Sequence, residues 1–193
     1  MAARIDRDTI DDLIMQVSGS IRNGVESGEF PFSSEDTFKF LFTWELGRAL
    51  GFPAEYRFDF ERDLYSSLDT DDTFLDVLAY TDPRFKVALE FKLPKKSSAG
   101  RGSNSTQTRA KICRDISRLS YLVQKRIEAV AVGFFLFASD EGAYLREGQK
   151  YRTFNTKPKR KGVLSDRMGP KGRFAWLKPI KIWKSVGENG GEA

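Results

Sequence analysis

Three charged residues lie inside two apolar segments near the middle of the chain. Asp76 lies within residues 74–78, and Glu90 and Lys92 lie within residues 87–93. Charged groups in such segments are costly unless they are paired or liganded. Two carboxylates can hold a hard cation such as Mg²⁺ or Mn²⁺, and a lysine beside them can orient or deprotonate an attacking water. The trio favours metal-dependent hydrolysis of a phosphoryl group.

The trio requires two paired strands. Side chains alternate along a strand, so Glu90 and Lys92 point to one face of the segment that contains them. A turn signal at residues 81–84 allows this strand to pair with residues 73–80 as an antiparallel hairpin. Asp76 can then lie near Glu90. Taken one at a time, each of the three residues is better explained as a member of an ordinary ion pair at a strand edge, and only the three together favour a functional site.

The rest of the sequence predicts an α/β fold with a central mixed β-sheet flanked by helices. Hydrophobic periodicity and caps predict helices at about residues 5–27, 34–50 and 106–126, and strands at about residues 56–61, 73–80, 85–93, 129–138 and 174–183. The apolar run at residues 129–138 is typical of a strand that is buried on both faces. The core order is therefore helix, three strands, helix, strand.

The chain divides by composition into a core and a basic extension. We expect residues 1–145 to form the core with its N-terminal helix. Residues 146–184 form a basic C-terminal extension whose final strand packs on the same domain, and residues 185–193 form a frayed tail. A chain of 193 residues is long enough for one such domain.

A fourth acid lies on the helix that precedes the strands. Glu45 follows Leu41 and Phe42 by four and three residues, which places it on an apolar face of a helix that is apolar nearly all round and therefore expected to be buried. It can assist the metal directly or through water. Alternatively, it is the ion-pair partner of Arg48 or an acid at the surface.

Basic side chains follow the strands and indicate a polyanionic partner. Gln107, Lys111, Arg114 and Arg118 fall on one face of the third helix, opposite its apolar residues, and Lys111 can pair with Asp115 on the flank. Further candidate contacts to a nucleic-acid backbone are Lys95, Lys96, Lys159, Arg160 and Lys161. A merely solubilising surface is the alternative for each of these groups.

Composition excludes several other chemistries. The chain has no histidine, which removes imidazole bases and histidine zinc sites, and the single Cys113 removes an internal disulfide. The formal charge of +5 hides a division. Residues 1–90 carry 9 Lys/Arg and 19 Asp/Glu, whereas residues 91–193 carry 23 and 8. The basic half begins at the segment of Glu90, which suits a nucleic-acid partner.

These residues resemble the PD-(D/E)xK nuclease superfamily, which has a restriction-endonuclease-like fold. The resemblance covers residues 34–138 and rests on Asp76, then Glu90-Phe91-Lys92, within the order αβββαβ. Leu75 stands where the superfamily often has a proline. By position, the resemblance implies that Asp76 and Glu90 are metal ligands and Lys92 the catalytic lysine. It also matches Glu45 to an acid that some members carry on the first core helix.

The sequence therefore predicts a Mg²⁺- or Mn²⁺-dependent nuclease that hydrolyses phosphodiester bonds, in DNA rather than RNA. Alternatives are a non-catalytic module on the same fold that binds nucleic acid or another partner, and a nuclease for small or cyclic nucleotides. We expect a cytoplasmic protein without a membrane partner, because the N-terminus lacks the layout of a secretion signal and no apolar run has spanning length. A homodimer is compatible with cutting two strands.

Overall fold

The computed structural model of the chain describes residues 7–51, 57–68, 72–82, 85–95, 105–140, 167–171, 174–177 and 179–183. The helices are α1 (Arg7–Ser27), α2 (Glu35–Ala49), α3 (Ser105–Lys125) and a short 3₁₀ helix, η1 (Ile127–Ala129). The strands are β1 (Arg57–Asp63), β2 (Phe74–Asp82), β3 (Phe85–Lys92), β4 (Val130–Ser139), β5 (Arg167–Lys171), β6 (Phe174–Leu177) and β7 (Ile180–Trp183). The predicted core order of helix, three strands, helix and strand is confirmed.

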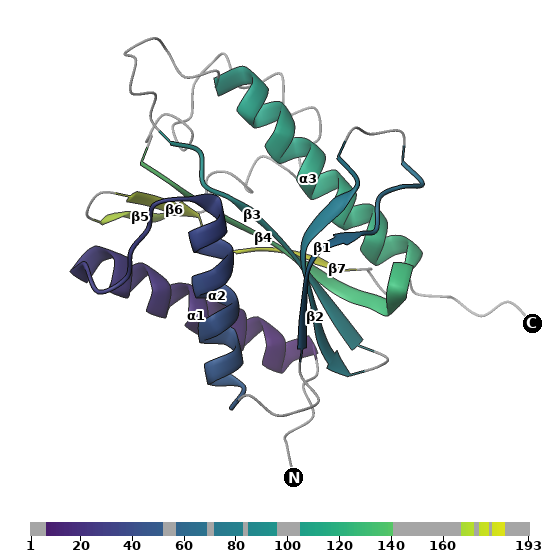
Figure 1. Cartoon of the computed structure of the whole chain (residues 1–193), viewed down its shortest axis with the longest axis horizontal. Coiled ribbons are helices and arrows are strands. Elements are labelled where there is room, and N and C mark those ends of the chain that lie inside the picture. The colour runs from purple at the N-terminus through teal and green to yellow at the C-terminus, as the bar shows by residue number, and fades with distance from the viewer. Residues whose placement is uncertain are drawn as a thin grey trace, which may run out of the picture.

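The strands form a mixed sheet in the order β1-β2-β3-β4-β6-β5, with β7 also beside β4 (Figure 1). β1, β2 and β3 are antiparallel neighbours, whereas β3 and β4 are parallel and joined through α3. The predicted strand at residues 174–183 is two strands. β6 pairs with the end of β4, and β7 pairs with its middle. Pro179 lies between them and has no N–H for a ladder hydrogen bond.

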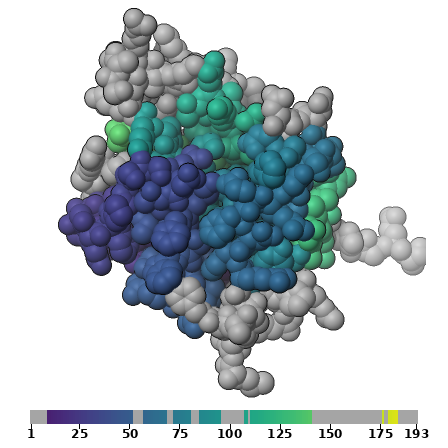
Figure 2. Space-filling view, viewed as in Figure 1, coloured from purple at the N-terminus to yellow at the C-terminus, as the bar shows by residue number. Residues whose placement is uncertain are grey.

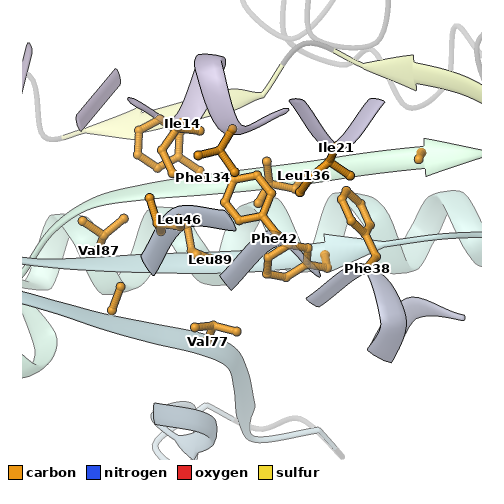
Figure 3. Packing of buried hydrophobic residues seen from close by; sticks show 14 of the residues in the cluster. Ile14, Ile21, Phe38, Phe42, Leu46, Val77, Val87, Leu89, Phe134 and Leu136 are labelled. Carbon is orange, nitrogen blue, oxygen red and sulfur yellow. The ribbon is translucent and has the colours of Figure 1, made fainter. Parts of the chain in front are cut away.

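Two hydrophobic clusters lie on opposite faces of the sheet. Along β3, Val87, Leu89 and Phe91 belong to the cluster under α1 and α2, while Ala88 belongs to the cluster under α3. This alternation follows from the period of two in a strand. Figure 3 shows the first cluster, in which Phe42 of α2 lies over the strands. The apolar sheet is thus covered on both faces, as the class α/β requires.

The helix α3 packs closely on β4, and this contact fixes the polar residues that α3 carries. A Cβ atom added at Gly133 would lie 3.3 Å from Leu119 Cδ2, so the glycine allows the helix to approach the strand. Leu119, Leu122 and Val123 are fully or nearly fully buried in the same contact. No helix among the described residues is long and apolar enough to cross a bilayer.

The helix α2 is less buried than its composition suggests. Ser34 caps its N-terminus by accepting a hydrogen bond from Thr37 N at 3.0 Å. However, Phe40 and Trp44 are 61% and 52% exposed, and their rings stack at 6.4 Å. Among the described elements, α2 packs against α1 and β3, and Phe40 and Trp44 lie on its exposed side. Figure 2 shows the surface of the N-terminal helices (purple) beside that of β1 and β2 (blue).

Candidate functional site

Asp76 lies at a kink in β2 where the strand loses its regular pairing on both sides. Pairing with β1 runs to Phe60↔Val77 and resumes at Arg62↔Leu75, which leaves out the row of Asp76. Side-chain alternation also breaks here, because Leu75 packs in the cluster under α3 and Val77 in the cluster under α1 and α2. Asp76 is therefore set apart from the ladder by the backbone itself.

Opposite this kink, β1 and β3 each contribute to the opening. Glu61 on β1 has φ 52°, a left-handed conformation that is uncommon for a residue with a side chain. Pairing between β2 and β3 ends at Val77↔Leu89, while β3 stays paired with β4 as far as Lys92↔Phe137. The strands β2 and β3 thus separate just where Asp76 and Glu90 face each other.

The Asp76 carboxylate fills the place that this separation opens. Its Oδ2 accepts a hydrogen bond of 2.7 Å from Phe91 N, so the side chain takes over a ladder partner of β3. Its other oxygen lies 3.3 Å from Lys39 Nζ of α2. After burial, the negative charge of Asp76 is the largest influence that raises the pKa of Glu90, so the two carboxyl groups lie close together. The predicted proximity of Asp76 and Glu90 therefore appears in the structure.

Glu90 is buried, with only 2% of its surface exposed. Tyr65 Oη donates a hydrogen bond of 3.0 Å to Glu90 Oε1, and Arg118 Nη2 lies 3.5 Å from the same oxygen. Burial first, and then the charges of Asp76 and Asp115, raise the pKa of Glu90 well above its ordinary value, although Arg118 opposes the shift. Glu90 is thus a carboxyl group that a cation can ionise.

Lys92 lies between two carboxylates on different helices. Its Nζ is 3.2 Å from Glu35 Oε1 of α2 and 3.3 Å from Asp115 Oδ2 of α3. Burial alone would lower the pKa of Lys92, but Asp115, Glu35 and Asp76 outweigh it and raise this pKa. Lys92 is therefore a protonated hydrogen-bond donor, which favours orienting a water over deprotonating it.

Two helices hold this arrangement in place. Glu35 also accepts a hydrogen bond of 3.0 Å from Leu93 N, so the first residue of α2 fixes the end of β3. Asp115 is 1% exposed and accepts a hydrogen bond of 3.1 Å from Arg118 Nη2. Arg118 in turn donates to the Asp72 carbonyl at 2.7 Å. Asp76, Glu90 and Lys92 are joined through these groups into one network.

Glu45 occupies a different place from the one expected for a metal-assisting acid. It accepts a hydrogen bond of 2.6 Å from Arg48 Nη2 and one of 3.4 Å from Ser20 Oγ, so it faces α1. The alternative of an Arg48 partner therefore describes this acid. The acid of α2 that reaches the strand ends is Glu35, ten residues earlier in the chain.

The basic stripe on α3 is not uniformly exposed. Gln107 and Lys111 are exposed and Arg114 is half-buried, as suits a helix face near solvent, but Arg118 is only 4% exposed. The β1–β2 connection lies against this part of α3, where the Tyr65 ring lies 4.5 Å from the Arg118 guanidinium. Arg118 is consequently a partner of the buried acids rather than a backbone clamp.

Of the other predicted nucleic-acid contacts, only Lys95 lies within the described residues. Lys95 follows β3 and is exposed. Lys96, Lys159, Arg160 and Lys161 lie outside the described residues. Within the basic extension at residues 146–184, the structure describes residues 167–171, 174–177 and 179–183, which contain β5, β6 and β7.

Three residues of the network were absent from the sequence-based site: Glu35, Tyr65 and Asp115. Arg118 was predicted as a backbone contact and not as a buried partner of the acids. Asp115 carried a usable signal, because it lies three residues after Ile112 and four before Leu119 on the apolar side of α3. Glu35 also suits the positive N-terminal end of α2. Because this explanation accounts for an acid at that position, the sequence offered no reason to expect its contact with Lys92. Tyr65 lies in a connection and carried no periodic signal.

The described residues offer two carboxylates for a cation. Within the described part of the chain, no group of three or more His, Cys, Asp or Glu side chains could hold a metal ion. Mg²⁺ is commonly bound through only one or two carboxylates, with waters and substrate phosphates completing its shell. Burial and the charge of Asp76 raise the pKa of Glu90, and a cation held by both carboxylates would offset this repulsion. The pair therefore fits Mg²⁺ or Mn²⁺.

A pH dependence of cation binding follows from Glu90. In the cation-free protein, the stability due to its neutral carboxyl is fully present below about pH 4.5 and is lost as pH rises through its raised pKa. A bound cation favours the ionised carboxylate. We expect Mg²⁺ to raise the thermal unfolding temperature, and to raise it more at about pH 8 than at about pH 6.

Glu90→Gln is the control for this expectation. It removes the ionisable group and keeps the shape, so the cation-free variant should be more stable than the wild type at about pH 8. It should also lose the response to Mg²⁺. An effect of Mg²⁺ that is equal at both pH values, or that persists in Glu90→Gln, would contradict the assignment.

Comparisons with known proteins do not assign this chain to a family. No family model matches it, and neither a curated protein nor a solved structure does so. What this site can do chemically follows from its own residues.

Proposed function

We propose that the protein is a metal-dependent nuclease that hydrolyses phosphodiester bonds, with DNA as the preferred substrate. The observation that carries this proposal is the meeting of Asp76, Glu90 and Lys92 where β2 and β3 separate. The proposed relationship to the PD-(D/E)xK superfamily and its restriction-endonuclease-like core rests on the same trio within the order α2-β1-β2-β3-α3-β4.

Each residue of the trio has a distinct proposed role. Asp76 and Glu90 hold Mg²⁺ or Mn²⁺, which when bound lowers the pKa of a coordinated water and offsets charge on the phosphoryl group. Lys92 is protonated, so it orients the attacking water and donates to the phosphoryl oxygen on which negative charge develops. Asp115 and Glu35 keep the Lys92 ammonium at the site through ion pairs.

The choice of a polyanionic substrate rests on charge. The site itself is rich in acids, which suits a cation but repels phosphate until that cation is present. The basic excess of residues 91–193 and the exposed Lys95 and Lys111 beyond the site offer contacts to a phosphate backbone. Such contacts carry affinity without sequence choice. A small nucleotide would make little use of them.

A cleavage assay tests the proposal. Supercoiled, linear and single-stranded DNA, and RNA, are incubated with the protein in Mg²⁺, Mn²⁺ or EDTA. We expect cleavage of DNA with either cation and none in EDTA. Lys92→Gln should lower the rate about 10²–10³-fold, since it removes a preorganised donor. Lys125→Gln, which removes an exposed lysine at the end of α3, should leave the rate unchanged.

The outcomes separate the alternatives. Binding of DNA without cleavage in either cation would support a non-catalytic binding module. Cleavage that is retained in Lys92→Gln would exclude the site as assigned. Hydrolysis of cyclic or short nucleotides alone would point to a small-nucleotide nuclease.

A further inference from the structure

A second polar site lies at the opposite end of the β2–β3 pair. A groove of about 520 Å³ is lined by Arg57, Phe58, Asp59, Arg62, Tyr80, Lys86 and Glu128. Tyr80 and Lys86 are direct partners across β2 and β3, and Tyr80 and Arg57 are direct partners across β1 and β2. Tyr80 lies four residues from Asp76 along β2, or about 13 Å at the rise of a strand. The groove is thus distinct from the metal-ligand pair.

The ladder across the three strands places two cations on one aromatic ring. The Arg57 guanidinium lies 4.5 Å from the centre of the Tyr80 ring, and Lys86 Nζ lies 4.8 Å from it. Two positive charges this close to one aromatic ring repel each other unless an anion nearby offsets the repulsion. Glu128 meets Lys86, at 2.9 Å from its Nζ. Arg57 lines the groove, with its guanidinium against the Tyr80 ring.

The acids of the groove are fewer than its cations and are already engaged. Glu128 pairs with Lys86 and lies 3.7 Å from Arg62. Asp59 lies 3.4 Å from Arg62 and accepts a hydrogen bond of 3.5 Å from Tyr80 Oη. The hydrogen bond from Lys86, together with the charges of Lys86 and Arg62, lowers the pKa of Glu128, which therefore stays ionised. One net positive charge remains.

The turn that presents Glu128 is conformationally unusual. Arg126, Glu128 and Ala129 have φ values of 52°, 51° and 63°, which side chains rarely adopt. Such strained segments concentrate at functional sites, where surrounding contacts hold them. Here the strained turn brings an acid over Lys86, in the position that an anionic ligand group would occupy.

We propose that this groove binds a phosphate group, on a free nucleotide or at the end of a nucleic-acid strand, and that Glu128 holds the cations in place until the phosphate replaces it. Arginine forks match phosphate oxygens in pairs. The volume exceeds that of a lone phosphate and suits a mononucleotide. This phosphate groove does not depend on the proposed nuclease activity, so it can bind phosphate whether or not the protein is a nuclease.

The test measures phosphate binding in EDTA, where metal-dependent cleavage is absent. The probes are inorganic phosphate, AMP, and a short oligodeoxynucleotide with or without a 5′-phosphate, each titrated calorimetrically. We expect Arg57→Gln and Lys86→Gln to weaken binding about tenfold. Arg22→Gln, which removes an arginine of α1 that does not line the groove, should leave affinity unchanged. Tighter binding of the phosphorylated oligonucleotide than of AMP would place the ligand on a strand end.

The direction in which Glu128→Gln changes the affinity for these probes decides between two explanations of the groove. If the carboxylate stands in for a phosphate, its removal should strengthen binding of the same probes several-fold. If the groove is only a network of ion pairs, the variant should lower the unfolding temperature and bind no probe. Unchanged affinity in Arg57→Gln, or weaker binding in Glu128→Gln, overturns the proposal, whatever the outcome of the cleavage assay.

Discussion

Replacing Asp76 by asparagine is expected to lower the rate of phosphodiester cleavage about 10³-fold while the fold stays intact. A metal ion contributes several kcal/mol of transition-state stabilisation, and about 4 kcal/mol corresponds to this change in rate. The amide oxygen of asparagine can still accept the hydrogen bond from Phe91 N, so the end of β3 should stay in place. What the variant lacks is the charge that holds the cation.

The measurement combines cleavage rate with cation affinity. Titration with Mn²⁺ should show weaker binding by Asp76→Asn, and its thermal unfolding in EDTA should resemble that of the wild type. The matched control is Asp36→Asn, the same chemical change at a side chain that is 88% exposed and contacts the same Lys39. A cleavage rate in Asp76→Asn within tenfold of that of the wild type would rule out Asp76 as a ligand.

The sequence was sufficient to predict the trio because local rules control it. Alternation along β3 places Glu90 and Lys92 on one face, and the turn before β3 brings Asp76 to their end of the hairpin. What alternation could not predict is the kink at Asp76, which lies opposite Glu61, a residue with a left-handed φ of 52°. Because β2 and β3 separate at the kink, Asp76 and Glu90 face each other beyond the end of the paired ladder.

The partners of the trio are set by contacts between distant segments. Arg118 falls on a polar stripe by helical spacing, yet the β1–β2 connection covers that part of α3 and buries it. Phe40 and Trp44 show the opposite error, since an apolar helix was expected to be buried and these rings face outward. In both cases periodicity describes the helix, whereas exposure depends on which other segments cover it.

Removing Arg118 is expected to destabilise the protein more than any other single change in the network. Arg118 Nη2 lies 3.5 Å from Glu90 and 3.1 Å from Asp115, and each of these three side chains is less than 5% exposed. Taking away one partner of a buried ion pair leaves charge without compensation, at about 3–5 kcal/mol. We expect Arg118→Met, which keeps similar bulk, to lose this much free energy of unfolding at about pH 7 in chemical denaturation.

The dependence of this loss on pH and on a second change identifies its cause. Arg118 holds the pKa of Glu90 below what burial alone would give, so without it the carboxyl accepts a proton more readily. The penalty in Arg118→Met should therefore shrink as pH falls. Adding Glu90→Gln to Arg118→Met should recover about 1–3 kcal/mol of the free energy of unfolding, because the effects of substitutions at neighbouring, interacting sites are not additive. The control is Arg62→Met in the more exposed Arg62–Asp59 pair, whose side chains are 45% and 38% exposed, and it should cost under about 1 kcal/mol. A loss in Arg118→Met as small as that of the control, or strict additivity in the double variant, would mean that the buried acids do not depend on Arg118.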